Sequence, residues 1–138
     1  MKTWLLIVGL ALVTVLANGC IVIDTEKTET SWSSTEPEDV TIREIDAVGR
    51  LSLEDNQREG YKRIAQRHNL SGGAQVHLVE AVFEHLSLED SKVDVLLTLV
   101  HNRCFSPEAK GAILDRLDKL ALEDSRREIL SAMSRRRH

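Results

Sequence analysis

The chain has 138 residues and a net charge of −4, with 42% hydrophobic, 29% charged and 4% aromatic residues. This length fits one folded domain. The negative charge excludes the basic footprint of a general nucleic-acid binder, and the few aromatic residues argue against a stacking surface for bases or sugars. Two cysteines, Cys20 and Cys104, are too few for a disulfide-rich scaffold or a multi-thiolate metal site. We therefore expect no nucleic-acid partner, metal or cofactor.

Residues 1–19 have the organisation of a secretory signal peptide. Lys2 supplies a positive start, residues 4–17 are apolar, and Ala17 and Gly19 are small residues at the −3 and −1 positions before Cys20. The sequence LANGC at 16–20 resembles the lipobox of bacterial lipoproteins. The resemblance implies an exported protein held by lipid on Cys20, on the periplasmic or outer-surface side of a membrane. Two acyl chains would give stable anchoring.

Two other interpretations of this N-terminus stay open. An ordinary signal peptidase could cut after Gly19 and leave Cys20 free to form a disulfide with Cys104. Residues 4–23 could also remain as an uncleaved anchor, because their nearly continuous apolar sequence is about long enough to span a bilayer.

The segment 20–37 is predicted to be a tether. Between residues 24 and 39 the chain has six acidic residues, seven serines and threonines, and one basic residue, Lys27. Such a composition favours disorder. As a flexible coil, the segment would reach about 20–25 Å.

The rest of the chain, 38–138, contains an internal repeat. The sequence LSLED occurs at 51–55 and at 86–90, and LALED follows at 120–124, at spacings of 35 and 34 residues. A period of this size is typical of stacked helical hairpins. We therefore predict an all-α fold with about six amphipathic helices in three hairpin-like repeats, as a small α-solenoid or bundle.

Each copy of the motif is predicted to begin a helix. Ser52 and Ser87 are expected to cap these helices, and Ala121 leaves the third helix without a side-chain cap. The Glu-Asp pairs place negative charge at the positive end of the helix dipole, so we interpret them as structural and not as catalytic carboxylates. The partner helices are expected to begin after Glu36-Pro37-Glu38, near Ser71, and at Ser106-Pro107, where the serine caps the helix and the proline takes its first position. Gly72-Gly73 is expected to break the chain.

Apolar stripes at helical spacing define the expected core. In the helices that follow the motif, the expected core residues are Leu53, Tyr61, Ile64, Ala65, Leu88, Val95, Leu96, Leu99, Val100, Leu122, Ile129, Leu130 and Met133. In the partner helices they are Val40, Ile45, Val48, Leu51, Val76, Val79, Val82, Phe83, Leu86, Ala109, Ile113, Leu114, Leu117 and Leu120.

Residues 51–133 resemble a helical-hairpin domain of unknown function found in secreted proteins. Members of that family repeat a hydrophobic–Glu–Asp/Ser–Arg/Lys helix start and a second helix led by serine. The resemblance implies a fold and no activity.

Two groups of residues are candidates for chemistry. His77, Glu80 and Glu84 share one helical face, whereas His85 points away. No glutamate precedes a histidine by three residues, as the helices of a di-metal bundle require, so we predict a solvated polar face. Cys104 follows His101 by three residues without a glycine-rich elbow and is interpreted as a partly buried structural cysteine.

The C-terminal end is basic and carries Arg126, Arg127, Arg135, Arg136 and Arg137. These arginines are either solvated charges or a patch for anionic lipid or an acidic envelope polymer.

Taken together, the pattern favours a non-enzymatic, membrane-tethered envelope lipoprotein whose helical repeats bind an envelope protein or peptide. One alternative is a small pilotin-like lipoprotein that escorts an envelope secretion component. Another is a small hydrolase that uses Cys104.

Overall fold

The structure, a computed structural model, describes residues 38–136. In this range it consists of helices and contains no strand, which confirms the all-α prediction. The helices are α1 (Glu38–Gly49), α2 (Glu54–Ala65), α3 (Gly72–His85), α4 (Glu89–His101), α5 (Pro107–Leu114), the short 3₁₀ helix η1 (Leu117–Lys119) and α6 (Glu123–Arg135).

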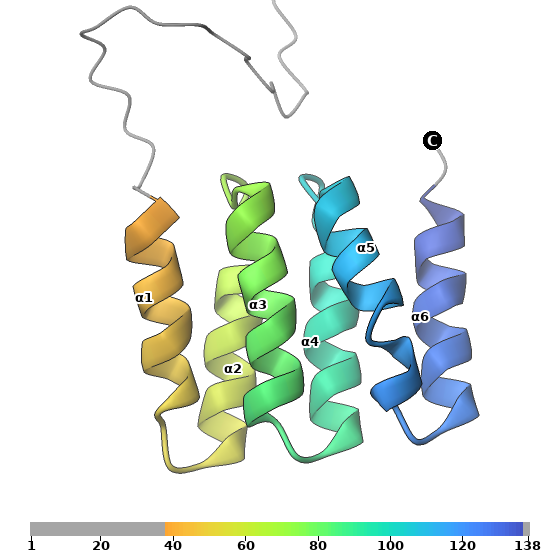
Figure 1. Cartoon of the computed structure of the whole chain (residues 1–138), viewed down its shortest axis with the longest axis horizontal. Coiled ribbons are helices and arrows are strands. Elements are labelled where there is room, and N and C mark those ends of the chain that lie inside the picture. Colours follow the sequence, from red (N-terminus) through yellow and green to blue (C-terminus); the bar gives the residue numbers. More distant parts are fainter. Residues whose placement is uncertain (1–37, 137–138) are drawn as a thin grey trace, which may run out of the picture.

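The helices form two layers (Figure 1). Helices α1, α3 and α5 pack side by side in one layer, and α2, α4 and α6 pack side by side in the other. The connections from α1 to α2, from α3 to α4 and from η1 to α6 lie at one edge, the lower edge in Figure 1. The α2–α3 and α4–α5 loops, the start of α1 and the end of α6 lie at the upper edge. This arrangement confirms three hairpin-like repeats stacked in sequence.

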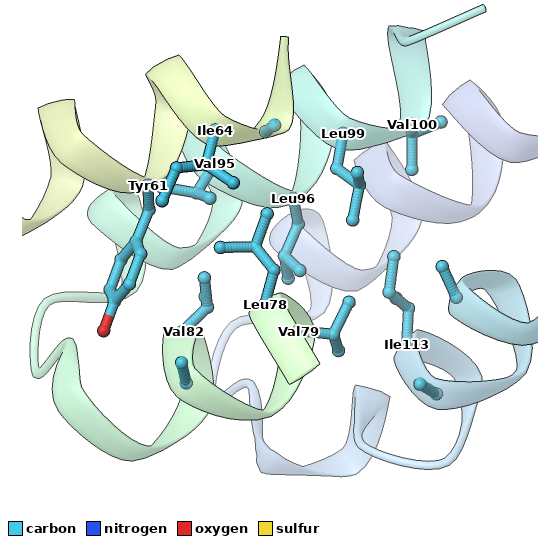
Figure 2. Close-up of a cluster of buried hydrophobic side chains, with 14 of the residues drawn as sticks. Tyr61, Ile64, Leu78, Val79, Val82, Val95, Leu96, Leu99, Val100 and Ile113 are labelled. Carbon is cyan, nitrogen blue, oxygen red and sulfur yellow. The ribbon is translucent and has the colours of Figure 1, made fainter. Parts of the chain in front are cut away.

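The core lies between the layers (Figure 2). Leu78 of α3, Leu96 and Leu99 of α4 and Ile113 of α5 have no exposed side-chain surface. Most of the expected apolar stripe residues are buried here, namely Ile45, Tyr61, Ile64, Ala65, Val79, Val82, Leu86, Val95, Leu96, Leu99, Val100, Ala109, Ile113, Leu120, Ile129 and Met133.

The core prediction is wrong for the second leucine of each repeat motif. Leu53, Leu88 and Leu122 are 64%, 60% and 55% exposed. Each is the N-cap residue of its helix, with an extended backbone, so the helical period does not carry it to the buried face. Four other expected core residues are also exposed, namely Val40, Leu51, Leu114 and Leu130.

The predicted cap at Ser106 is correct, as is the helix start near Ser71, whereas the predicted caps at Ser52 and Ser87 are wrong. Ser71 Oγ accepts a hydrogen bond from the Ala74 N–H at 3.1 Å, and Ser106 Oγ accepts one from the Ala109 N–H at 3.1 Å. Ser52 and Ser87 lie one residue before the N-cap, where the leucines make no side-chain cap bond. The expected break at Gly72-Gly73 is wrong too, because these glycines form the first turn of α3.

The glutamate of the repeat motif fastens each repeat to the next at the lower edge. Glu54 Oε1 accepts a hydrogen bond from the Leu88 N–H at 2.7 Å. One repeat later, the two carboxylate oxygens of Glu89 accept from the N–H groups of Ala121 and Leu122, both at 2.8 Å. These backbone groups precede the next helix. The glutamates therefore satisfy backbone N–H groups at the N-cap and just before it, which have no partner within the helix that follows.

A second series of bonds fastens the repeats at the upper edge. Asn102, which ends α4, donates through Nδ2 to the carbonyls of Ala65 and Arg67 at 2.6 and 2.7 Å. Arg136, which ends α6 and lies 34 residues later, donates to the carbonyls of Val100, Asn102 and Arg103. Each side chain thus satisfies carbonyls at the end of the preceding repeat.

Candidate interaction surface

Leu53, Leu88 and Leu122 form a row along the lower edge, which we call the leucine edge. They stand at the starts of α2, α4 and α6, which are neighbours in one layer. Packed helices lie about 8–10 Å apart. The row therefore presents three exposed leucines at roughly this interval.

The fold itself does not require these leucines. Ser, Thr, Asp and Asn are the favourable N-cap residues and leucine is among the poorest, and burial cannot compensate because more than half of each side chain is exposed. The other motif positions have structural roles. Leu86 and Leu120 are core residues, and Glu54 and Glu89 bind the following repeat.

The surroundings of the leucine edge are acidic. The segments 50–55, 85–90 and 118–124 together contain seven carboxylates and two basic residues. The side chains of Asp55 and Asp124 are 83% and 93% exposed, and Asp90 is exposed as well. Arg127, one turn further along α6, pairs with Glu123 at 2.7 Å and with Asp124 at 3.2 Å. Apolar side chains thus alternate with carboxylates along this edge.

The residues of the His77 face bind different neighbours. His77 Nε2 lies 2.7 Å from Asp46 Oδ1 of α1, and Glu80 accepts from Arg116, beyond α5, at 2.6 Å. The two residues tie α3 to the helices on either side of it. Within residues 38–136, no group of three or more His, Cys, Asp or Glu side chains is placed to hold a metal ion.

Cys104 is half-buried in the α4–α5 loop, as the sequence predicts. Its N–H donates to Asn102 Oδ1 at 2.9 Å, and its carbonyl accepts from Gln75 Nε2 at 2.8 Å. Cys104 is not a free thiol in the structure, whereas a nucleophilic role would need one. Cys20, the predicted lipid attachment site, lies outside the described residues.

The predicted arginine patch is divided between the two ends of α6. Arg126 donates to the Leu120 carbonyl at 2.9 Å, and its neighbour Arg127 pairs with the acidic residues in the first turn of α6. Arg135 and Arg136 lie about 14 Å away along the helix, where the Arg136 guanidinium also covers the Phe105 ring at 5.5 Å. Arg137 lies outside the described residues.

Tyr61 is a buried polar residue that the sequence does not single out as special. Its side chain is fully buried, and its hydroxyl has no hydrogen-bond partner in the part of the chain that the structure describes. A Cβ atom on Gly49 would lie 2.9 Å from that hydroxyl and 2.6 Å from the His85 ring, so glycine is needed for α1 to approach here. Burial, together with the negative charges of Asp46 and Glu84, raises the pKa of Tyr61 to about 12.

An open hollow lies between the ends of α2 and α4 at the upper edge, lined by Gln66, His68, Asp94, Leu97, Thr98, His101, Asn102 and Arg103. Its polar groups are largely engaged within the protein. Asp94 pairs with Lys62 at 2.9 Å, and His101 Nδ1 lies 2.7 Å from the Leu97 carbonyl oxygen. The leucine edge is therefore the stronger candidate for a site.

No protein-family model, curated protein or solved structure matches this chain. Among the described helices, none combines the length and apolar character needed to cross a membrane.

Proposed function

We propose that this protein is an exported, membrane-tethered component of the cell envelope that binds a protein partner through the leucine edge and catalyses no reaction. The observation that carries the proposal is the exposure of Leu53, Leu88 and Leu122 at N-cap positions. Three separate helices have leucine as the N-cap residue, although leucine stabilises a helix start less than serine, threonine, aspartate or asparagine. An exposed apolar row with a polar surround is typical of a protein interaction surface.

The membrane tether in this proposal rests on the N-terminal sequence. Acylation of Cys20 would hold the domain at a membrane through residues 20–37. The rival fate of Cys20 is a disulfide with Cys104, which uses the same sulfur atom and excludes the lipid. The absence of a free thiol at Cys104 fits the rival. Both fates require export, because disulfides persist in oxidising compartments.

Mass spectrometry of the mature protein distinguishes the two fates. Lipidation predicts an N-terminus at Cys20 that carries acyl mass, and a protein that detergent releases from membranes. The variant Cys20→Ser should then remain unprocessed or become soluble. An unmodified N-terminus at Cys20, linked by a disulfide to Cys104, would remove the lipid anchor from the proposal.

Chemical crosslinking and capture from envelope fractions tests the binding function. We expect a partner to be retained by the wild-type protein and lost with Leu88→Ser. This variant should keep its fold, since serine is a favourable N-cap residue. Leu130→Ser is the matched control, because Leu130 is an exposed leucine in the body of α6, 43% accessible and away from the edge. Equal capture by Leu88→Ser and the wild type would contradict the proposal. A captured envelope secretion component would support the pilotin-like form of this function.

A further inference from the structure

We infer that the partner presents a basic, amphipathic α-helix that lies across the starts of α2, α4 and α6 and places apolar side chains, seven residues apart, on the leucine edge. This inference rests on the proposed function and specifies the chemistry of the partner. It follows from the spacing of the leucines and from the charge around them.

The spacing expected for the leucine edge is close to that of a heptad repeat. Neighbouring helices in one layer lie about 8–10 Å apart, so Leu53, Leu88 and Leu122 follow one another at about this interval. Residues seven positions apart on a helix share one face and lie about 10.5 Å apart. Alternate residues of an extended strand on one face are separated by about 7 Å or about 13 Å, which fits less well. About 15 helical residues would cover the three leucines.

The charge of the edge selects a basic partner. Exposed carboxylates at Asp55, Asp90 and Asp124 flank the three leucines, and opposite charges beside an apolar contact speed association and fix its register. A second copy of this chain would bring the same acidic edge against itself, and an anionic membrane would be repelled in the same way. A helix with lysine or arginine beside its apolar stripe offers both an apolar contact for the leucines and a charge opposite to that of the carboxylates.

A designed peptide provides the probe. We would use a fluorescent helix of about 18 residues with three leucines seven positions apart and lysines on both sides of the leucine stripe. One control peptide has the same composition with the leucines distributed around the helix, and a second has glutamate in place of lysine. Binding to the full chain is measured by fluorescence anisotropy.

We expect the heptad lysine peptide to bind, both controls to bind at least about tenfold more weakly, and added salt to weaken the interaction. Leu88→Ser should weaken binding about tenfold, a typical loss for a central interface residue. Leu130→Ser should bind like the wild type. Circular dichroism of both variants confirms that they are folded.

The outcomes separate this inference from the proposed function. Binding of the glutamate or redistributed peptide as tightly as the heptad lysine peptide overturns the inference, and so does binding to anionic vesicles that Leu88→Ser abolishes. Failure of the heptad peptide to bind overturns it too. The proposed function still stands in these cases if capture of the native partner depends on Leu88, and both fall if it does not.

Discussion

At the scale of single residues, the two leucines of the second and third copies of the repeat motif have different environments, whereas Leu51 and Leu53 of the first copy are both exposed. Leu86 and Leu120, which directly follow α3 and η1, are 2% and 1% exposed, whereas Leu88 and Leu122, two residues later, are 60% and 55% exposed. Leu86 and Leu120 are the C-cap residues of α3 and η1 and belong to the buried cluster, whereas Leu88 and Leu122 are the N-cap residues of α4 and α6 and stand outside the buried face of the helix they begin. One leucine therefore belongs to the core and the next belongs to the surface.

Serines near helix starts should differ in their effect on stability according to whether they cap. Ser71→Ala and Ser106→Ala each remove a cap bond and should lower the free energy of unfolding by about 0.5–2 kcal/mol. Ser87→Ala should change it by less than about 0.5 kcal/mol, because Ser87 is exposed and precedes the N-cap. Urea unfolding of the three variants measures these differences. An equal loss for Ser87→Ala and Ser71→Ala would contradict the observed helix starts.

Tyr61 should make the stability depend on pH at the alkaline end. The hydroxyl ionises near pH 10.0 in an unfolded chain and near pH 12 in the folded protein, so folding favours the protonated form. The contribution of this hydroxyl to the free energy of unfolding is complete below pH 10, and it is lost as the pH rises through 12. Since Tyr61 is the only tyrosine, tyrosinate absorbance reports it directly. A midpoint close to 10 in the folded protein would contradict its burial.

Tyr61→Phe is the control for this titration. It removes the ionisable group and the hydroxyl without emptying the core. At neutral pH we expect the free energy of unfolding to stay the same or rise by about 1 kcal/mol, because the hydroxyl is buried without a partner among the described residues. The alkaline dependence assigned to Tyr61 should disappear in this variant.

At the scale of elements, polar side chains join the repeats at both ends of the helices. Glutamates accept backbone N–H groups of the following repeat at the lower edge, and Asn102 and Arg136 donate to carbonyls of the preceding repeat at the upper edge. Gln75 adds a further link, with bonds to the Leu70 and Cys104 carbonyls and from the Ser106 N–H. The repeat period of the sequence thus reflects these polar contacts between repeats as well as the apolar residues of the core.

The glutamate link should show itself as acid sensitivity. Burial pushes the pKa of Glu89 up, but hydrogen bonds from Ser125 and from the Leu122 and Ala121 N–H groups, with the charge of Lys92, hold it below its ordinary 4.5. Folding therefore favours the carboxylate. The contribution of the Glu89 carboxylate to the free energy of unfolding is complete above pH 4.5 and is lost as the pH falls through the lowered pKa. We expect Glu89→Gln to lower the melting temperature at neutral pH. In acid, the melting temperature of this variant should fall less steeply than that of the wild type.

Asp90→Asn is the matched control for this link. Asp90 is the adjacent, exposed carboxylate, and it lacks the two backbone bonds that Glu89 makes. Its substitution should leave the acid dependence close to that of the wild type. If both variants respond alike, the effect comes from the general charge of the helix start and not from the link between repeats.

Local patterns predicted the elements better than their contacts. The repeat period, the helix start near Ser71 and the Ser106 cap predicted the hairpins correctly, because helix starts depend on residues close in the chain. The N-cap register was wrong by one residue, since Ser87 and Leu88 are both next to a Glu-Asp pair and serine is the usual cap. The role of Glu89 could not be predicted, because its bonds reach residues 32 and 33 positions away. The leucine edge was not predicted for the same reason, because the wrong register placed Leu53, Leu88 and Leu122 in the core.

At the scale of the whole molecule, the two edges differ in character. The described chain enters at the upper edge through α1 and leaves there after α6 (Figure 1). Residue 38, where the described chain begins, therefore lies at the upper edge, where Arg103 and Arg135 are exposed. The acidic leucine edge lies at the opposite side. If Cys20 holds the protein at a membrane, the leucine edge is at the side remote from the attachment, where a partner can reach it.

The last prediction concerns which parts of the chain fold together. Removing residues 121–138 deletes α6, whose Ile129, Ala132 and Met133 are core residues, and it leaves Glu89 without its donors. Loss of buried residues such as Ile129 costs about 2–5 kcal/mol each, against a total stability of about 5–15 kcal/mol for a typical domain. We expect the 38–120 chain to lose cooperative thermal unfolding by circular dichroism.

The 38–138 chain is the comparison for that deletion and also reports on Cys20. If 38–138 is a complete domain, it should melt cooperatively, close to the midpoint of the mature protein. A deficit of about 2–4 kcal/mol relative to the mature protein, abolished when both are reduced, is the effect expected for a lost disulfide and would support the Cys20–Cys104 pair over the lipid. A cooperative 38–120 chain with the midpoint of 38–138 would show that the repeats fold independently, since neither edge could then join them as described.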